Sequence, residues 1–483
     1  MMSVVWVLLI VLEVMLLFNF IILVHELGHF LAARALGLYV DRFAIWFGRP
    51  LWQKKIGDVT WQLGCIPAGG FVSLPQLSPM EWIEGQTLPS GSPIRPATPL
   101  QKIIVAVAGP LFSFGLALFF GVGVWIVGQP VGESELTTTI GFVGRDSSAA
   151  KAGLRVGDVI RAIDGVPVTR WGGTEAGSVI WRVVASEGST LKFDLVRDGQ
   201  PLLVEAVPEK ETITGWKRAS LRELAIAPAE VPMIGRVLPD SPAQAAGLRA
   251  NDLLTAVDGT HLWSSQQLSE HLQAGGTNTI RLTVERQGAR QEIAVAPAWA
   301  AREGLTNRVA MIGVVWDLTG RLTLAYPTPW RQVTGFVNGM VNTIGALISP
   351  KSDIKPQHLG GPVQILRIYY LLFQSPQGWR LALWFSVFMN VNLAILNLLP
   401  IPMLDGGHIM LGLAEMVRRR PLSEPLIRWV QTAGAVVVLG FLLYVTSFDV
   451  GDLFRGGGKA PVAEKVRFES PPPTSAPAPA APR

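Results

Sequence analysis

The chain has 483 residues, of which 49% are hydrophobic and only 16% charged. Soluble globular proteins usually carry roughly 25% charged residues, so this composition indicates a membrane protein. The net charge of +5, without a basic stripe interleaved with aromatic residues, argues against nucleic-acid binding, and the single Cys65 excludes an internal disulfide and a thiolate metal cluster.

Four apolar segments are long enough to cross a hydrocarbon core of about 30 Å. The expected membrane helices are residues 1–36, 101–128, 379–400 and 426–447. Lys and Arg gather after the first helix, before the second, and between the third and fourth. The positive-inside rule therefore predicts cytoplasmic loops there, with both termini and the large central region outside.

The first segment contains His25-Glu26-Leu27-Gly28-His29, an HExxH motif. Positions i and i+4 of a helix share one face, so His25 and His29 can bind one metal ion, with Glu26 beside them as a general base. The motif is short and also arises by chance. Because charged groups are costly inside a bilayer, we favour a functional site over a polar helix end that reaches toward the headgroups.

The region between the second and third helices repeats itself. Residues 147–168 read SSAAKAGLRVGDVIRAIDGVPV, and residues 241–262 read SPAQAAGLRANDLLTAVDGTHL. Each copy predicts a short helix, a turn, an apolar strand and a hairpin. Both resemble PDZ domains of bacterial membrane and envelope proteases, and we expect these domains at residues 137–210 and 231–298.

PDZ domains bind an extended peptide at the edge of a sheet. We expect the binding strands to be residues 140–143 and 234–237, with the peptide-binding positions Ile140, Gly141, Phe142, Ile234 and Gly235. The alternative is that the two domains act as spacers or size filters and bind no defined peptide.

Residues 299–378 are expected to be a linker, with an interfacial helix over 330–348. Residues 401–425 are predicted to form a loop, because Pro400 and Pro402 break the third helix and Gly406 and Gly407 allow a sharp turn. Catalytic zinc usually has three protein ligands, so Asp405 in this loop is the candidate third ligand, although a turn aspartate is the alternative. The tail, residues 448–483, is rich in Pro, Ala and Ser and is expected to be disordered.

The HExxH motif together with residues 397–406, which read NLLPIPMLDG, resembles the site-2 protease family. The PDZ-like repeat is similar to its bacterial branch, the regulator-of-sigma-E type. The resemblance implies a multi-pass α-helical membrane protein of about four transmembrane helices with two inserted α+β PDZ domains. It implies an intramembrane zinc metalloendopeptidase of the bacterial inner membrane, with one Zn²⁺ per chain and periplasmic PDZ domains.

The implied partners are single-span membrane substrates such as anti-sigma factors and signal-peptide remnants, peptide ligands of the PDZ domains, and the lipid bilayer. By resemblance, the zinc ligands are His25, His29 and Asp405, and Glu26 is the general base. His408 is expected to lie near the site without binding the metal. Many family members have Asn where Ser113 stands, which puts a polar contact from this span in doubt.

Two further groups are implied to contact substrate. Asn392 and Asn397 match asparagines that hold substrate, although hydrogen bonds between spans are the alternative. Gly69, Gly70 and Phe71 match a membrane-dipping β-loop within residues 37–100. An edge strand there can pair with an unwound substrate segment.

Two other functions stay open from the sequence. A metal-binding scaffold that recruits peptides explains the repeat but gives Glu26 no role. A transporter would use the intramembrane His and Asp as ion sites, but the spans form no inverted repeat. Dependence of activity on Glu26 separates a protease from both alternatives.

Overall fold

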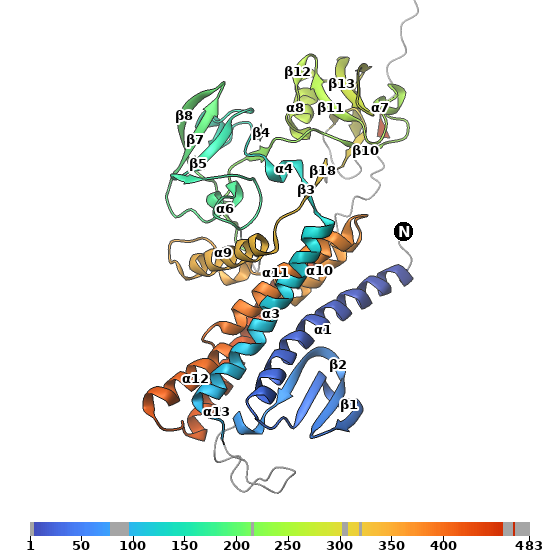
Figure 1. The fold of residues 1–483 in the computed structure, drawn as a ribbon. Coiled ribbons are helices and arrows are strands. Elements are labelled where there is room, and N and C mark those ends of the chain that lie inside the picture. Colours follow the sequence, from blue (N-terminus) through green and yellow to red (C-terminus); the bar gives the residue numbers. More distant parts are fainter. Residues whose placement is uncertain are drawn as a thin grey trace, which may run out of the picture.

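The computed structural model describes residues 4–77, 96–213, 217–301, 308–317, 321–456 and 467–468. Figure 1 shows a bundle of long helices with a β-rich region at one end and a β ribbon near the other. The β-rich region is inserted between two helices of the bundle, α3 and α11.

Among the described residues, four helices are long and apolar enough to cross a membrane, as the sequence predicted. They are α1 (Val4–Ala35), α3 (Pro99–Val127), α11 (Gly378–Leu398) and α13 (Glu424–Gly456). Helix α13 runs beyond the expected end at residue 447 into the segment predicted to be disordered.

Helix α3 is the central member of the bundle and packs against α1, α11 and α12. Its start is fixed by Thr98 and Gln101, which form a capping box around Pro99 in the first turn. A Cβ on Gly28 of α1 would lie only 2.5 Å from the carbonyl oxygen of Ala108. Glycine therefore lets α1 and α3 touch, as small residues do between membrane helices.

The β ribbon follows α1 and consists of the antiparallel strands β1 (Arg42–Ile56) and β2 (Val59–Ser73). The ribbon curls, so residues 42–45 pair with residues 60–63 on one side and residues 70–73 on the other. Residues 70–73 are thus an outer segment of the ribbon. A short turn, η1 (Pro75–Leu77), follows the ribbon, and the described chain resumes at residue 96, shortly before α3.

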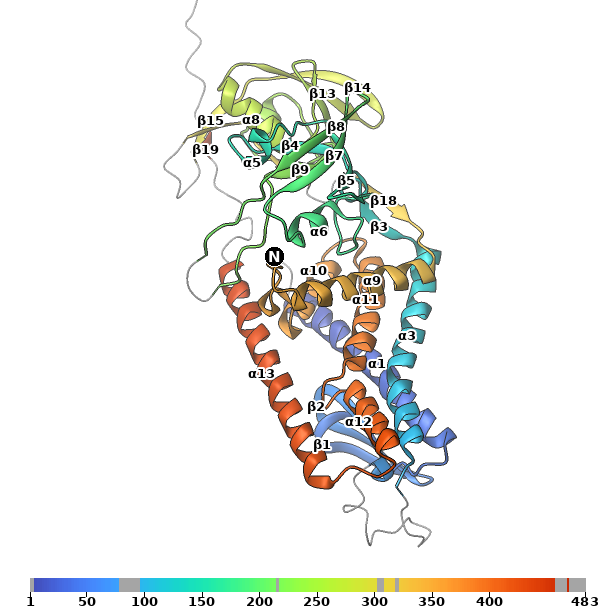
Figure 2. The same ribbon diagram turned by 90° about the vertical axis from the view of Figure 1, so that its left-hand side faces the viewer.

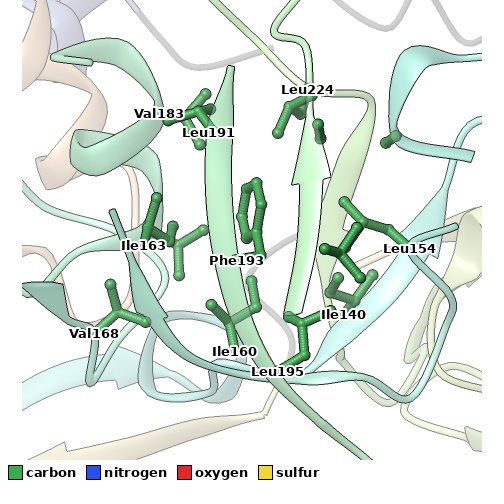
Figure 3. Packing of buried hydrophobic residues seen from close by; sticks show 14 of the residues in the cluster. Ile140, Leu154, Ile160, Ile163, Val168, Val183, Leu191, Phe193, Leu195 and Leu224 are labelled. Carbon is green, nitrogen blue, oxygen red and sulfur yellow. The ribbon is translucent and has the colours of Figure 1, made fainter. Parts of the chain in front are cut away.

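The first repeat unit has a four-stranded sheet ordered β6-β5-β7-β8 and a two-stranded pair β4-β9. Phe193 lies in its core among Ile140, Ile160 and Leu195 (Figure 3). Its elements are β4 (Ile140–Val143), α5 (Ser148–Lys151), β5 (Val159–Ile163), β6 (Val166–Pro167), α6 (Val179–Val184), β7 (Leu191–Arg197), β8 (Gln200–Ala206) and β9 (Ile226–Pro228).

The second unit repeats this plan, with a sheet ordered β12-β11-β13-β14 and the pair β10-β17. In both units, β9 and β17 extend the structure beyond the predicted ends at residues 210 and 298. The elements are β10 (Ile234–Val237), α7 (Pro242–Ala245), β11 (Leu253–Val257), β12 (Thr260–His261), α8 (Ser265–Gly275), β13 (Ile280–Arg286), β14 (Ala289–Val295), β15 (Ala298–Ala301), β16 (Val309–Met311) and β17 (Val314–Trp316).

The two ends of the β-rich insert lie side by side, because β3 (Gln129–Gly132) pairs with β18 (Leu322–Ala325). Helix α4 (Glu133–Leu136) follows β3. Helix α9 (Pro329–Ile348) occupies the predicted interfacial segment and lies across the end of the bundle in Figures 1 and 2.

The remaining connections are η2 (Pro356–His358), α10 (Pro362–Phe373) and α12 (Asp405–Arg418). Residues 401–425, predicted as a loop, therefore contain a helix. In the tail, β19 (Arg467–Phe468) pairs with β15, and the other residues beyond 456 lie outside the described part of the chain.

Ion pairs fasten the first unit to the helical part. Asp353, between α9 and α10, contacts Lys210 and Arg222, each at 2.6 Å. Arg218 contacts Asp449 of α13 at 2.7 Å, and the Asp449 side chain is fully buried. The position of this unit is thus linked to the end of the last membrane helix.

Candidate active site

Three potential metal ligands converge from α1 and α12. His25 Nε2 lies 3.1 Å from Asp405 Oδ2, and His29 Nε2 lies 3.3 Å from Asp405 Oδ1. The two Nε2 atoms are 3.3 Å apart. Among the described residues, these three form the group of His, Cys, Asp and Glu side chains that could hold a metal ion.

The local sequence explains how Asp405 reaches the histidines. Met403 has a φ of +86°, which is unusual for a bulky residue, and Asp405 then begins α12. A Cβ on Gly406 would overlap the carbonyl oxygens of Leu398 and Leu399, so only glycine allows α12 to pack this closely against the end of α11. The sharp turn was predicted at Gly406 and Gly407, but both glycines lie in the first turn of α12, and the left-handed residue is Met403.

Helix α3 orients both imidazole rings. His29 Nδ1 lies 2.8 Å from the carbonyl oxygen of Val105, and His25 Nδ1 lies 3.0 Å from Ser113 Oγ. A carbonyl can only accept, so Nδ1 of His29 carries the hydrogen and the lone pair of a neutral ring is on Nε2. Ser113 therefore makes the polar contact that the sequence left in doubt.

The arrangement suits zinc. Two ligand atoms at about 2.0–2.1 Å from a tetrahedral zinc lie roughly 3.3 Å apart. The separations of 3.1–3.3 Å among these side chains agree with that geometry. In addition, Asp405 Oδ2 is buried without a hydrogen-bond donor, so an acceptor is left that a cation would satisfy.

Glu26 and the predicted substrate-contacting segment share one cavity with these ligands. The cavity has a volume of about 650 Å³, and Glu26, Gly69, Gly70 and Phe71 are among its lining residues. A Cβ on Gly70 would lie 3.4 Å from Glu26 Cγ, so the outer segment of the β ribbon passes directly beside the candidate base.

The two predicted asparagines are placed differently. Asn397 lines the cavity, and its Nδ2 lies 3.4 Å from His25 Nε2. Asn392 instead donates to the carbonyl oxygen of Phe388 within its own helix. His408 lines the cavity but does not join the three-residue group.

Two charged residues near the cavity were missed from the sequence. Lys102 and Glu415 form an ion pair at 2.9 Å, with side chains 15% and 4% exposed. Both line the cavity and join α3 to α12. In the sequence, each of the two is visible only as a charged residue near one end of a helix. No local pattern indicates that Lys102 and Glu415 contact each other.

The predicted peptide-binding strands lie inside the paired part of each unit. The N–H of Ile140 donates to Asp158, and its carbonyl accepts from Gly157, while β4 pairs with β9 on its other side. Ile234 makes the equivalent bonds with Asp252 and Asn251, and β10 pairs with β17. In the described part of the chain, β9 and β17 each pair with one strand, β4 and β10 respectively.

Gly141, Phe142 and Gly235 lie in these same strands. The carbonyl oxygen of Gly141 accepts a hydrogen bond from Ser264 of the second unit at 2.9 Å. Beside Gly235, a Cβ would lie 3.1 Å from the backbone nitrogen of Asp317. A peptide at either strand would have to displace these contacts.

Comparison with known proteins extends over most of the chain. A family profile described as peptidase family M50 matches residues 13–441. A putative zinc metalloprotease of Neisseria meningitidis is 30% identical over 435 residues, which are 84% of this chain and 92% of that protein. The regulator of sigma-E protease RseP of Escherichia coli is 27% identical over 462 residues, 87% of this chain and 93% of that protein.

Among solved structures, the PDZ domain of an SdrC-like protein from Listeria innocua matches 18% of this chain and 94% of that chain, with 22% identity and a TM-score of 0.16. This similarity concerns a small part of the chain.

Proposed function

Because this chain belongs to peptidase family M50, a family of site-2 type zinc metalloendopeptidases, we propose that it uses His25, His29 and Asp405 to bind zinc and cuts transmembrane segments of other membrane proteins. One observation carries the assignment of these residues. Three ligand groups from two separate helices meet within 3.1–3.3 Å of one another, with Glu26 in the same cavity.

His25, His29 and Asp405 would hold the zinc ion, which when bound would supply Lewis-acid activation of the scissile carbonyl and of a water molecule. Glu26 accepts a proton from the attacking water and passes it to the leaving amine. Val105 and Ser113 keep the two imidazoles turned so that both Nε2 atoms face Asp405. Asn397, beside His25, is suited to hold a backbone group of the substrate.

A transmembrane helix hides its amides in internal hydrogen bonds and must unwind before hydrolysis. Within the described part of the chain, residues 70–73 have a strand partner on one side, residues 42–45, and Gly70 lies beside Glu26. Such an outer segment can pair with an extended substrate and present its peptide bond to the site.

We assign the PDZ fold to both repeat units and place them on the periplasmic side of the bacterial inner membrane. The charge bias of the loops and the position of both units at one end of the bundle support this placement (Figure 1). A peptide could add to the second edge of β9 or β17, since each of these strands pairs with one strand among the described residues. The two units also stand where they can exclude substrates that keep bulky outer domains.

The preferred substrates are then single-span proteins with short outer segments, including anti-sigma factors and signal-peptide remnants. The name of the RseP relative, regulator of sigma-E protease, points to the sigma-E pathway. Deleting both units as the structure bounds them, residues 137–316, should admit substrates that have not been trimmed, and unchanged selectivity would count against gating by the two units.

The test compares purified wild type with Glu26→Gln in detergent, on a panel of tagged single-span proteins with short outer segments. Mass spectrometry then gives the cleavage positions. We expect the wild type to cut within spans, a strong chelator to stop it, and Glu26→Gln to be inert. Equal cleavage by both proteins would assign the activity to a contaminant, and zinc binding without cleavage would favour a scaffold.

A further inference from the structure

An amide inside the first membrane helix is bonded to the β ribbon. Asn19 of α1 accepts a hydrogen bond from the Trp46 indole, with 2.6 Å between Oδ1 and Nε1. Its Nδ2 donates to the carbonyl oxygen of Met15 at 2.7 Å, so the orientation of the amide is fixed. A polar side chain on an apolar span is costly, which suggests that this contact serves a purpose.

Trp46 itself has a strained backbone. Its φ is +67°, a value that is rare for a bulky side chain and persists only where the surroundings impose it. The strain lies at a break in strand pairing. Ile45 is opposite Gly70, whereas Phe47 is opposite Ile66, so β1 leaves the outer segment of the ribbon at Trp46.

Phe47, the residue after Trp46, packs against residues 69–71, the part of the outer segment that lies beside Glu26. The Phe47 ring stacks on Phe71 with 6.0 Å between centroids and 9° between planes. A Cβ on Gly69, whose φ is +90°, would overlap the same ring. The position of Phe47 therefore fixes residues 69–71, and Gly70 in turn lies against Glu26.

We propose that Asn19 is a positioning residue: its hydrogen bond to Trp46 sets the register of residues 69–73 against Glu26 and thereby selects the peptide bond that is cut. This inference rests on the proposed function, in which that segment pairs with an extended substrate. Consecutive residues of a strand are about 3.3 Å apart. A ribbon displaced by one residue would place a neighbouring bond at the site without disturbing the zinc ligands.

The experiment uses the full-length protein in detergent and the best-cleaved single-span protein of the panel. Asn19→Leu, Trp46→Phe and the double variant are compared with wild type. The matched control is Trp52→Phe, on the same strand, whose side chain is 51% exposed. For each protein, kcat, KM, zinc per chain, the thermal midpoint and the distribution of cleavage positions are measured.

We expect each single variant to lower kcat/KM about fivefold, as the loss of one hydrogen bond would. The double variant should lose no more than either single, because both remove the same contact. Cleavage should spread from one principal bond to its neighbours, with zinc content and the thermal midpoint unchanged. Trp52→Phe should behave as wild type.

The proposal is overturned if the variants keep a single principal bond, if the two losses add, or if activity falls only in step with zinc content or thermal stability. A failure of the proposed function looks different. In that case the wild type would not cut within spans, or Glu26→Gln would cut equally well, whatever happens at Asn19.

Discussion

Gly109 of α3 lies directly against Nε2 of His29. A Cβ at this position would overlap His29 Nε2 and lie 2.9 Å from His25 Nε2. The glycine thus keeps open the space in which the two imidazoles and Asp405 meet.

Gly109→Ala is therefore expected to reduce bound zinc to well below one per chain and to abolish cleavage. The matched control is Gly115→Ala on the same helix, where a Cβ would meet nothing within 4 Å. Zinc is measured by elemental analysis of the purified proteins. Equal zinc content in the two variants would show that the site tolerates the methyl group.

Ser113→Ala removes the group that faces Nδ1 of His25. Loss of a hydrogen-bond partner of a metal-binding histidine typically lowers metal affinity by about 10- to 100-fold, and we expect a change in this range from competition with a chelator. Ser386→Ala is the control, because Ser386 is also fully buried but bonds to Ala382 and Tyr369 rather than to His25 or His29. A similar effect on zinc from both substitutions would argue against a specific role of Ser113.

Asn397→Ala should lower turnover more than Asn392→Ala does. Asn397 faces the cavity beside His25, whereas Asn392 bonds within its own helix. We expect about a tenfold loss of kcat/KM for Asn397→Ala, as for a lost hydrogen bond to substrate, with little change in the thermal midpoint. Parallel losses of activity and stability in Asn397→Ala would instead assign it to helix packing.

Glu415→Gln should destabilise the protein strongly, because it leaves Lys102 buried without its partner. Removing one partner of a buried ion pair costs about 3–5 kcal/mol, while replacing both with apolar residues is often tolerated. Glu415→Gln should thus lower the thermal midpoint more than Lys102→Met combined with Glu415→Leu. The control is Glu205→Gln, since Glu205 and its partner Lys192 are 51% and 60% exposed and their pair should contribute little. A midpoint shift in Glu205→Gln as large as that in Glu415→Gln would contradict this account.

The attachment of the first unit should weaken in acid. Burial opposes ionisation of Asp353, but hydrogen bonds from Lys210 and Arg222 outweigh it and hold the pKa of this carboxyl below its usual value. Because the pKa of Asp353 is lower in the attached state, ionised Asp353 stabilises attachment at pH values above about 3.9, the pKa of an unperturbed aspartate. This stabilisation is lost as the pH falls through the lowered pKa.

Spin labels on the first unit and on α9 would report this change as a wider distance distribution below about pH 4. Asp353→Asn cannot form the ion pairs and should show the wider distance distribution already at pH 7. In this variant the distribution should not widen further when the pH is lowered below about 4. The same pH response in wild type and Asp353→Asn would assign the effect to other groups.

The sequence predicted the parts of the site that have a local pattern. HExxH places two histidines on one helical face through spacing alone, and Asp405 was marked by its prolines and glycines. Helix α12 was missed because those glycines were interpreted as a turn, although Gly406 allows close packing against Leu398 and Leu399, and Gly407 against Ile401. Strand β9 was missed because it is short and pairs with a strand far away in the sequence.

The hydrogen bond between His29 and the backbone carbonyl of Val105 is protected against loss by point mutation. Every amino acid presents a carbonyl, so no substitution at position 105 deletes this hydrogen bond while α3 keeps its course. Ser113 supports His25 with a side chain, which a single codon change can remove. Among descendants of this chain, substitutions at position 113 can therefore change the hydrogen bond to His25. The hydrogen bond that orients His29 is kept as long as α3 keeps its backbone course.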